Sequence, residues 1–199
     1  MKEKIKQYIN DNLKSIAIIF LFAIMGIVLG IFLYQIVPDA IKNDLIKTMK
    51  TTLDLTKNEN FKGINIIKNG MISNIILVIV IYSMSLTLLS PYLISLLSFF
   101  KGLSIGMYIP TIFNIFGASK GILAMFLLVI IPNLIYIPSY IFFSVNSVKF
   151  HYSLLSEENK FILFIKEVIR IIFGFSIMFL GVILEQLTSN WVITLYGSI

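Results

Sequence analysis

The chain alternates between long uncharged stretches and shorter charged ones. The four longest uncharged stretches cover residues 15–37, 69–100, 102–119 and 121–148. A transmembrane helix needs about 20 residues to cross a hydrocarbon core of about 30 Å, so each stretch is long enough, or nearly so, to span a bilayer. The pattern therefore predicts an all-α, polytopic integral membrane protein.

Prolines and glycines divide these stretches into individual helices. Pro38 follows the first stretch, Pro91 ends the next predicted helix, and a glycine-containing turn at 117–121 comes before the last stretch. A polar connection at 151–166, which places the single histidine, His151, in a loop, precedes one more apolar segment. We expect a helical bundle of about five transmembrane helices. Within one membrane domain of residues 1–199, the predicted spans are 15–37, 69–90, 92–116, 122–145 and 168–190.

The segment 38–68 differs from the rest because lysines and acids are mixed with its apolar residues. Apolar side chains recur in it every four residues, which is typical of an amphipathic helix. We predict an external amphipathic loop that either lies flat among the lipid headgroups or docks another protein. The candidate docking residues are Ile41, Leu45, Met49 and Leu53.

Charge predicts the orientation. Five spans place the termini on opposite sides of the membrane, and more Lys and Arg residues fall on the N-terminal side, so we expect the N-terminus in the cytoplasm and the C-terminus outside. Only 13% of the residues are charged and 58% are hydrophobic, whereas soluble domains carry about 25% charged residues. The net charge of +6 is scattered among apolar spans, which favours the lipid bilayer over nucleic acid as a partner.

Glycines recur at helical spacing in several predicted spans. Such spacing exposes the backbone on one helix face and lets a second helix approach closely. We expect these glycines to pack helices within the bundle, and a homodimer contact through the first two is the alternative. They are Gly26, Gly30, Gly102, Gly106, Gly174 and Gly181.

Polar residues mark one face on each of the third and fourth predicted spans. Lys101 either lies near the middle of the bilayer, where its charge must be paired or hydrated, or reaches the headgroups from a span that begins later. In the first case Glu185 of the fifth span is the acid that could pair with it. These faces hold helices together or, alternatively, line the path of a small transporter or channel component. The third-span face contains Lys101, Ser104, Tyr108 and Thr111, and the fourth-span face contains Asn133, Tyr136, Tyr140, Ser144 and Ser147.

Enzyme signatures are nearly absent. The chain has no cysteine and one histidine, and it lacks the H-E-x-x-H, G-x-S-x-G and P-loop patterns. An intramembrane enzyme would have neither nucleophile nor base, and a coupled carrier would lack a second buried acid. We therefore predict no catalytic, cofactor-binding or metal-binding residues.

Three motifs and their order resemble a known family. The motifs are residues 99–106 (FFKGLSIG), the turn 117–121 (GASKG) and residues 132–138 (PNLIYIP), and they follow a first span and a charged loop. Together they resemble the stage II sporulation protein M family of endospore-forming bacteria, over nearly the whole chain.

This resemblance implies a function in sporulation. It implies a five-span protein of the cell membrane that is needed for engulfment of the forespore and that recruits cell-wall hydrolases to the septal membrane. The implied partners are a peptidoglycan amidase/endopeptidase and a lytic transglycosylase, while the protein itself cleaves no bond. We expect a non-catalytic membrane scaffold that acts in peptidoglycan remodelling. The docking residues come from the amphipathic pattern of 38–68 and not from the resemblance.

Overall fold

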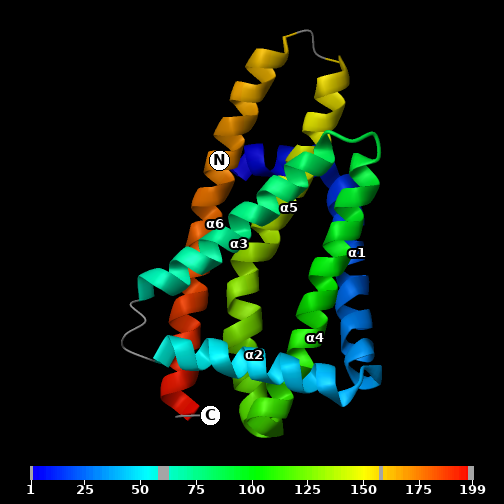
Figure 1. Cartoon of the computed structure of the whole chain (residues 1–199). Coiled ribbons are helices and arrows are strands. Elements are labelled where there is room, and N and C mark those ends of the chain that lie inside the picture. The colour runs from blue at the N-terminus through cyan, green and yellow to red at the C-terminus, as the bar shows by residue number, and fades with distance from the viewer. Residues whose placement is uncertain (1, 58–62, 157–158, 197–199) are drawn as a thin grey trace.

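The computed structural model describes residues 2–57, 63–156 and 159–196, and the regular structure in these ranges is entirely helical (Figure 1). This confirms the all-α prediction. The elements are α1 (Lys2–Ile36), α2 (Asp39–Lys57), α3 (Gly63–Ser85), α4 (Ser90–Met125), the π-helical turn η1 (Phe126–Ile130), α5 (Ile131–Ser156) and α6 (Lys160–Tyr196).

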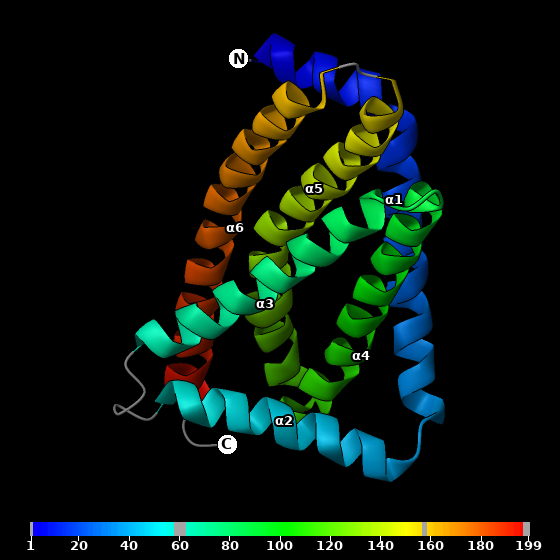
Figure 2. The ribbon, with the colours of Figure 1, turned by 45° about the horizontal axis from the view of Figure 1, so that its top comes forward.

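The long helices form a bundle with one helix across its end. Helices α1, α4, α5 and α6 run along the bundle, α3 crosses it obliquely, and α2 lies across the end where the C-terminus is found (Figure 2). Among the described residues, three helical stretches are long and apolar enough to cross a membrane: Gln7–Ile36, Ser90–Ser156 and Lys160–Leu195. Such a chain is a multi-pass membrane protein.

The longest of these stretches contains two antiparallel helices. Gly117 has a φ of 73°, a left-handed conformation that glycine adopts without steric cost. The chain reverses direction near this point, inside the predicted turn at 117–121, and α5 returns beside α4 (Figure 1). The π-helical turn η1 ends two residues before Pro132, whose ring excludes ordinary helical pairing with the carbonyl four residues earlier. The side chain of Asn133 donates to the carbonyl of Val129 at 2.8 Å and so satisfies one acceptor there.

The helix at the predicted span 69–90 has different bounds. Helix α3 begins at Gly63 and ends at Ser85, and its apolar part, Gly70–Ser85, is shorter than the three long apolar stretches. The helix ends early because the chain turns tightly: the Ser85 hydroxyl donates to the carbonyl of Tyr82 at 2.5 Å, and the amide of Leu86 donates to the carbonyl of Ser83 at 3.2 Å.

The predicted polar connection at 151–166 is also wrong for most of its length. Helix α5 continues to Ser156 and α6 begins at Lys160, while residues 157 and 158 lie outside the described ranges. The helices extend because their polar side chains find partners between helices. His151 is buried and its Nδ1 lies 2.9 Å from the carbonyl oxygen of Ser85, so Nδ1 carries the proton that is donated.

Glycines bring α1 and α4 into backbone contact. A Cβ added at Gly26 would overlap the carbonyl oxygen of Phe99, and one added at Gly106 would lie 3.0 Å from the Cα of Gly30. A Cβ at Gly102 would likewise overlap the carbonyl oxygen of Ala23. Because α4 of the same chain occupies this face, the alternative of dimerisation through Gly26 and Gly30 is wrong.

The remaining two glycines of the predicted set make room for rings of α5. A Cβ at Gly174 would lie 2.5 Å from Cζ of Phe143, and a Cβ at Gly181 would lie 2.9 Å from Cε1 of Tyr136. The missing side chains at these two glycines of α6 let α5 approach. The space at Gly181 also fixes the position of the Tyr136 ring at the site described next.

Candidate functional site

A polar cavity lies between the helices on the side of the bundle toward α2. Its volume is about 350 Å³, and α2, α3, α4, α5, η1 and α6 all contribute to its wall. All six residues predicted as intramembrane polar groups line it: Lys101, Ser104, Tyr108, Asn133, Tyr136 and Glu185. Further polar lining comes from Thr52, Ser73, Asn74 and Ser189.

Among the described residues, one basic and one acidic side chain line the cavity. The Tyr136 hydroxyl donates to Oε2 of Glu185 at 2.6 Å, which fixes the carboxylate against α5. Lys101 borders the same space, yet among the described residues no ion pair joins it to Glu185. Helix α4 begins at Ser90, so Lys101 lies about 16 Å along its axis at about 1.5 Å per residue. The side chain of Lys101 is exposed, so the choice between an interior group and a headgroup contact stays a prediction.

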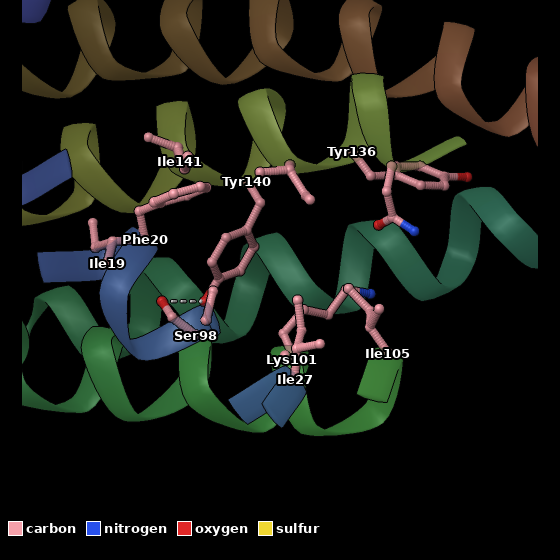
Figure 3. Close-up of a pocket in the computed structure, with 13 residues that line it drawn as sticks. Ile19, Phe20, Ile27, Ser98, Lys101, Ile105, Tyr136, Tyr140 and Ile141 are labelled. Atoms are coloured by element: carbon pink, nitrogen blue, oxygen red, sulfur yellow. Dashed lines mark hydrogen bonds between the residues drawn. The ribbon is translucent and has the colours of Figure 1, made fainter. Parts of the chain in front are cut away.

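A second, apolar pocket adjoins this cavity on the side of α1. Its volume is about 40 Å³, and it shares Lys101, Asn133 and Tyr136 with the polar cavity. Figure 3 shows Lys101 on α4 facing Tyr136 and Tyr140 on α5. The other walls are apolar side chains, among them Ile19, Phe20, Ile27, Ile105 and Ile141. Lys101 therefore stands between a polar and an apolar space.

The polar face of α5 contacts three neighbouring helices. Tyr136 reaches α6, the hydroxyls of Tyr140 and Ser98 of α4 are 3.1 Å apart (Figure 3), and the Ser147 hydroxyl donates to the carbonyl of Ile81 in α3 at 3.0 Å. Such interhelical hydrogen bonds hold membrane helices together. Thr111, from the predicted face of α4, is buried and donates to its own helix, to the carbonyl of Met107 at 2.9 Å.

The predicted docking face of α2 is mostly covered by the bundle. Met49 is 2% exposed and Leu53 is 5% exposed, and both belong to a core cluster with residues of α4, η1 and α6. Leu45 is half-buried, and only Ile41 is exposed, at 45%. The apolar side chains of Met49 and Leu53 pack against helices of the same chain and not against an external partner. The prediction that all four residues contact a partner is therefore wrong.

A family comparison fits this architecture. Residues 16–185 match the family model described as Stage II sporulation protein M. The chain belongs to this family. No curated protein and no solved structure gives a match. Membership of the stage II sporulation protein M family makes the chain a membrane protein of sporulation and engulfment, in a family that is generally non-catalytic. The resemblance seen in the three sequence motifs is thereby confirmed.

This stage II sporulation protein M family member also contains a buried ionic cluster that sequence reasoning missed. Glu167 of α6 is 2% exposed; the Tyr82 hydroxyl donates to its Oε1 at 2.6 Å and Arg170 donates to its Oε2 at 2.7 Å. The expected lack of a second buried acid is therefore wrong. A signal was present in the sequence, because Glu167 and Arg170 are three residues apart and so lie on one helix face. Because both carboxylate oxygens are satisfied, the cluster stabilises the bundle without leaving a reactive group.

Metal binding has no candidate in the described part of the chain. No group of three or more histidine, cysteine, aspartate or glutamate side chains gathers there. The candidate functional sites are the cavity around Lys101 and Glu185, which Thr52 and Leu53 of α2 border, and the opposite, outer side of α2.

Proposed function

We propose that this protein is a non-catalytic scaffold that recruits and positions peptidoglycan hydrolases at the sporulation septum during forespore engulfment. The family match over residues 16–185 supports this function. The partners proposed are an amidase/endopeptidase and a lytic transglycosylase. Holding two enzymes at one membrane site raises their effective concentration on the same stretch of wall without new chemistry.

The proposed topology has five passes, formed by α1, α3, α4, α5 and α6. Helix α3 would be the oblique pass, since it crosses the bundle at an angle (Figure 2), and its apolar part, Gly70–Ser85, is shorter than the others. An odd number of passes agrees with termini at opposite ends of the bundle (Figure 2). The excess of Lys and Arg toward the N-terminus favours a cytoplasmic N-terminus, which would place α2 and the C-terminus on the outer face, where the cell wall lies.

The proposed docking surface is the side of α2 that faces away from the bundle. The exposed positions on this side are Ile41, Asp44, Lys47, Thr48 and Thr51. They form a mainly polar surface with one apolar side chain, which suits a partner that meets the protein in water above the membrane. Met49 and Leu53 would not contact the partner. Their burial would fix α2 to the bundle and so hold the docking surface in one position.

Recruitment is tested by replacing Asp44, Lys47, Thr48 and Thr51 together with Ala in sporulating cells. We expect the variant to accumulate at the septum while the hydrolases fail to gather there and no longer co-purify with it. The matched control replaces Asn10, Asp11 and Lys14, which are exposed at the opposite end. Normal hydrolase localisation in cells with the α2 variant would refute docking through this surface.

Orientation is tested by single cysteines, which are unique labels because the natural chain has none. A cysteine at Asn43 in α2 should react with an impermeant maleimide on intact protoplasts. A cysteine at Asn10 should react only after the membrane is opened. The opposite pattern would place α2 in the cytoplasm and exclude direct contact with enzymes of the wall.

A small transporter or channel component is the second candidate. The observation that favours it is the polar cavity of about 350 Å³, with Lys101 and Glu185 in its wall. Reconstituted vesicles that take up a small solute, with loss of uptake in Glu185→Gln, would support this function. Absence of solute uptake by the wild-type protein, together with intact hydrolase recruitment by Glu185→Gln, would support the scaffold function alone.

A further inference from the structure

The cavity between α4, α5 and α6 has the size of a ligand site. Its volume of about 350 Å³ lies within the range of about 300–1,000 Å³ typical of small-molecule pockets. Polar side chains from several helices converge on it, although the surroundings of the helices are otherwise apolar. The side chains of Lys101 and Glu185 are exposed in its wall, so a ligand can reach both.

Several hydrogen-bond donors in the wall are already used locally. The Ser104 hydroxyl donates to the carbonyl of Phe100 at 3.1 Å. The amide nitrogen of Asn74 donates to the carbonyl of Gly70 at 3.0 Å. Asn133 donates to its own helix in the same way. The amide oxygens of both asparagines remain acceptors, and the strongest groups left for an occupant are the ammonium of Lys101 and the carboxylate of Glu185.

The two charges set the chemistry of the occupant. An anion alone at Lys101 would lie in the same cavity as Glu185 and would be repelled by it. A cation alone at Glu185 would be repelled by Lys101 for the same reason. A molecule with both an anionic group and an ammonium group gives each of these two side chains a partner of opposite charge.

We propose that this cavity binds a small zwitterion, with its anionic group at Lys101 and its ammonium group at Glu185. Two sources could supply this chemistry: a soluble zwitterion, or the headgroup of phosphatidylethanolamine. The adjoining apolar pocket shares Lys101, Asn133 and Tyr136 with the cavity, so apolar surface lies next to the proposed anionic end. That neighbourhood suits the attached apolar part of a lipid.

Binding is measured by calorimetric titration of the purified full-length protein in detergent with phosphoethanolamine. Phosphocholine, which has no N–H donor, and inorganic phosphate, which has no cation, are the comparison probes. We expect phosphoethanolamine to bind at least about tenfold more tightly than either, since a hydrogen bond to a charged group is lost in each comparison. Equal binding of inorganic phosphate would overturn the zwitterion assignment.

Variants locate the site. Lys101→Met and Glu185→Gln should each weaken phosphoethanolamine binding by about tenfold or more. Lys14→Met and Glu3→Gln, which change the same charges on exposed positions outside the cavity, should bind as the wild type does. If Lys101→Met does not accumulate, Lys101→Gln replaces it. Undiminished binding in the cavity variants would place the ligand elsewhere and refute the proposal.

The lipid source is tested in nanodiscs of phosphatidylcholine with and without phosphatidylethanolamine. If the headgroup is the ligand, the ethanolamine lipid raises the thermal unfolding temperature of the wild type, and the increase disappears in Glu185→Gln. If a soluble zwitterion is the ligand, phosphoethanolamine binds equally in both kinds of nanodisc. A cavity that takes water only would show neither effect, and the proposal would fall. The site does not depend on hydrolase recruitment, so loss of recruitment alone leaves it intact.

Discussion

Replacing Gly102 with Ala tests the close crossing of α1 and α4. The new Cβ would overlap the carbonyl oxygen of Ala23, and the facing Gly26 is in the same position with respect to the carbonyl oxygen of Phe99. Backbone atoms cannot rotate away as a side chain can. The two helices must therefore separate along the crossing, and the close contacts around Gly30 and Gly106 are lost as well.

The magnitude follows from two opposing terms. An extra methyl group in a packed interior costs about 1–3 kcal/mol, and the upper end applies here because the displaced atoms are backbone. Alanine in place of a helical glycine recovers about 1 kcal/mol of helix propensity. We therefore expect Gly102→Ala to lower the free energy of unfolding by about 2 kcal/mol.

Gly70→Ala is the matched control. A Cβ at Gly70 would lie 3.0 Å from Cγ1 of Val182, which is a side-chain methyl that can shift, so the change in stability should stay within about 1 kcal/mol. Unfolding is followed by circular dichroism during titration with sodium dodecyl sulfate in mixed micelles. The double variant Gly26→Ala, Gly102→Ala should lose less than the sum of the single changes, because one separation relieves both overlaps. Stability of Gly102→Ala equal to that of Gly70→Ala would refute the crossing as described.

Two further predictions concern side chains. Leu53→Ala should destabilise the protein by about 2–5 kcal/mol, because it empties part of a buried core. Ile41→Ala, on the exposed side of α2, should cost about 1 kcal/mol or less. Equal effects of the two changes in the same titration would contradict the burial of Leu53. Glu167→Gln should lower the free energy of unfolding by about 1–3 kcal/mol, because a charge-assisted hydrogen bond in a buried cluster is lost. Glu3→Gln, at an exposed position, should change it by no more than about 0.5 kcal/mol. Both are measured by thermal unfolding in detergent, and a wild-type unfolding temperature in Glu167→Gln would show that the carboxylate is not needed.

The sequence allowed the class of fold to be predicted because the lipid environment limits the options. Long uncharged runs must form helices when no water is present to satisfy the backbone. The turn at 117–121 was predictable for a similar reason, since Gly117 supplies the positive φ that ends one helix. The end of α3 was not predictable in this way, because it depends on a tight turn of ordinary residues before Pro91 and not on a change in hydrophobicity.

Partners of individual side chains were harder to predict. The same apolar spacing at Met49 and Leu53 suits an outside partner or the protein's own bundle, and only the position of α2 against α4 and α6 decides between them. Glu167 was missed because a charged residue at the edge of an apolar run resembles a solvated one. Its burial depends on Tyr82, which is 85 residues away along the chain, and no local pattern reports such a contact.

Helix α2 connects the two proposed activities. Leu53 and Thr52 of α2 border the polar cavity, and the outer side of the same helix is the proposed docking surface. A ligand that changes the position of α2 would therefore change partner affinity, and thermodynamic reciprocity requires the partner to change ligand affinity by the same factor. The linkage is measurable as a shift in the dissociation constant of phosphoethanolamine when a hydrolase is bound. Equal dissociation constants with and without hydrolase would show that α2 is a rigid support for both surfaces and transmits nothing between them.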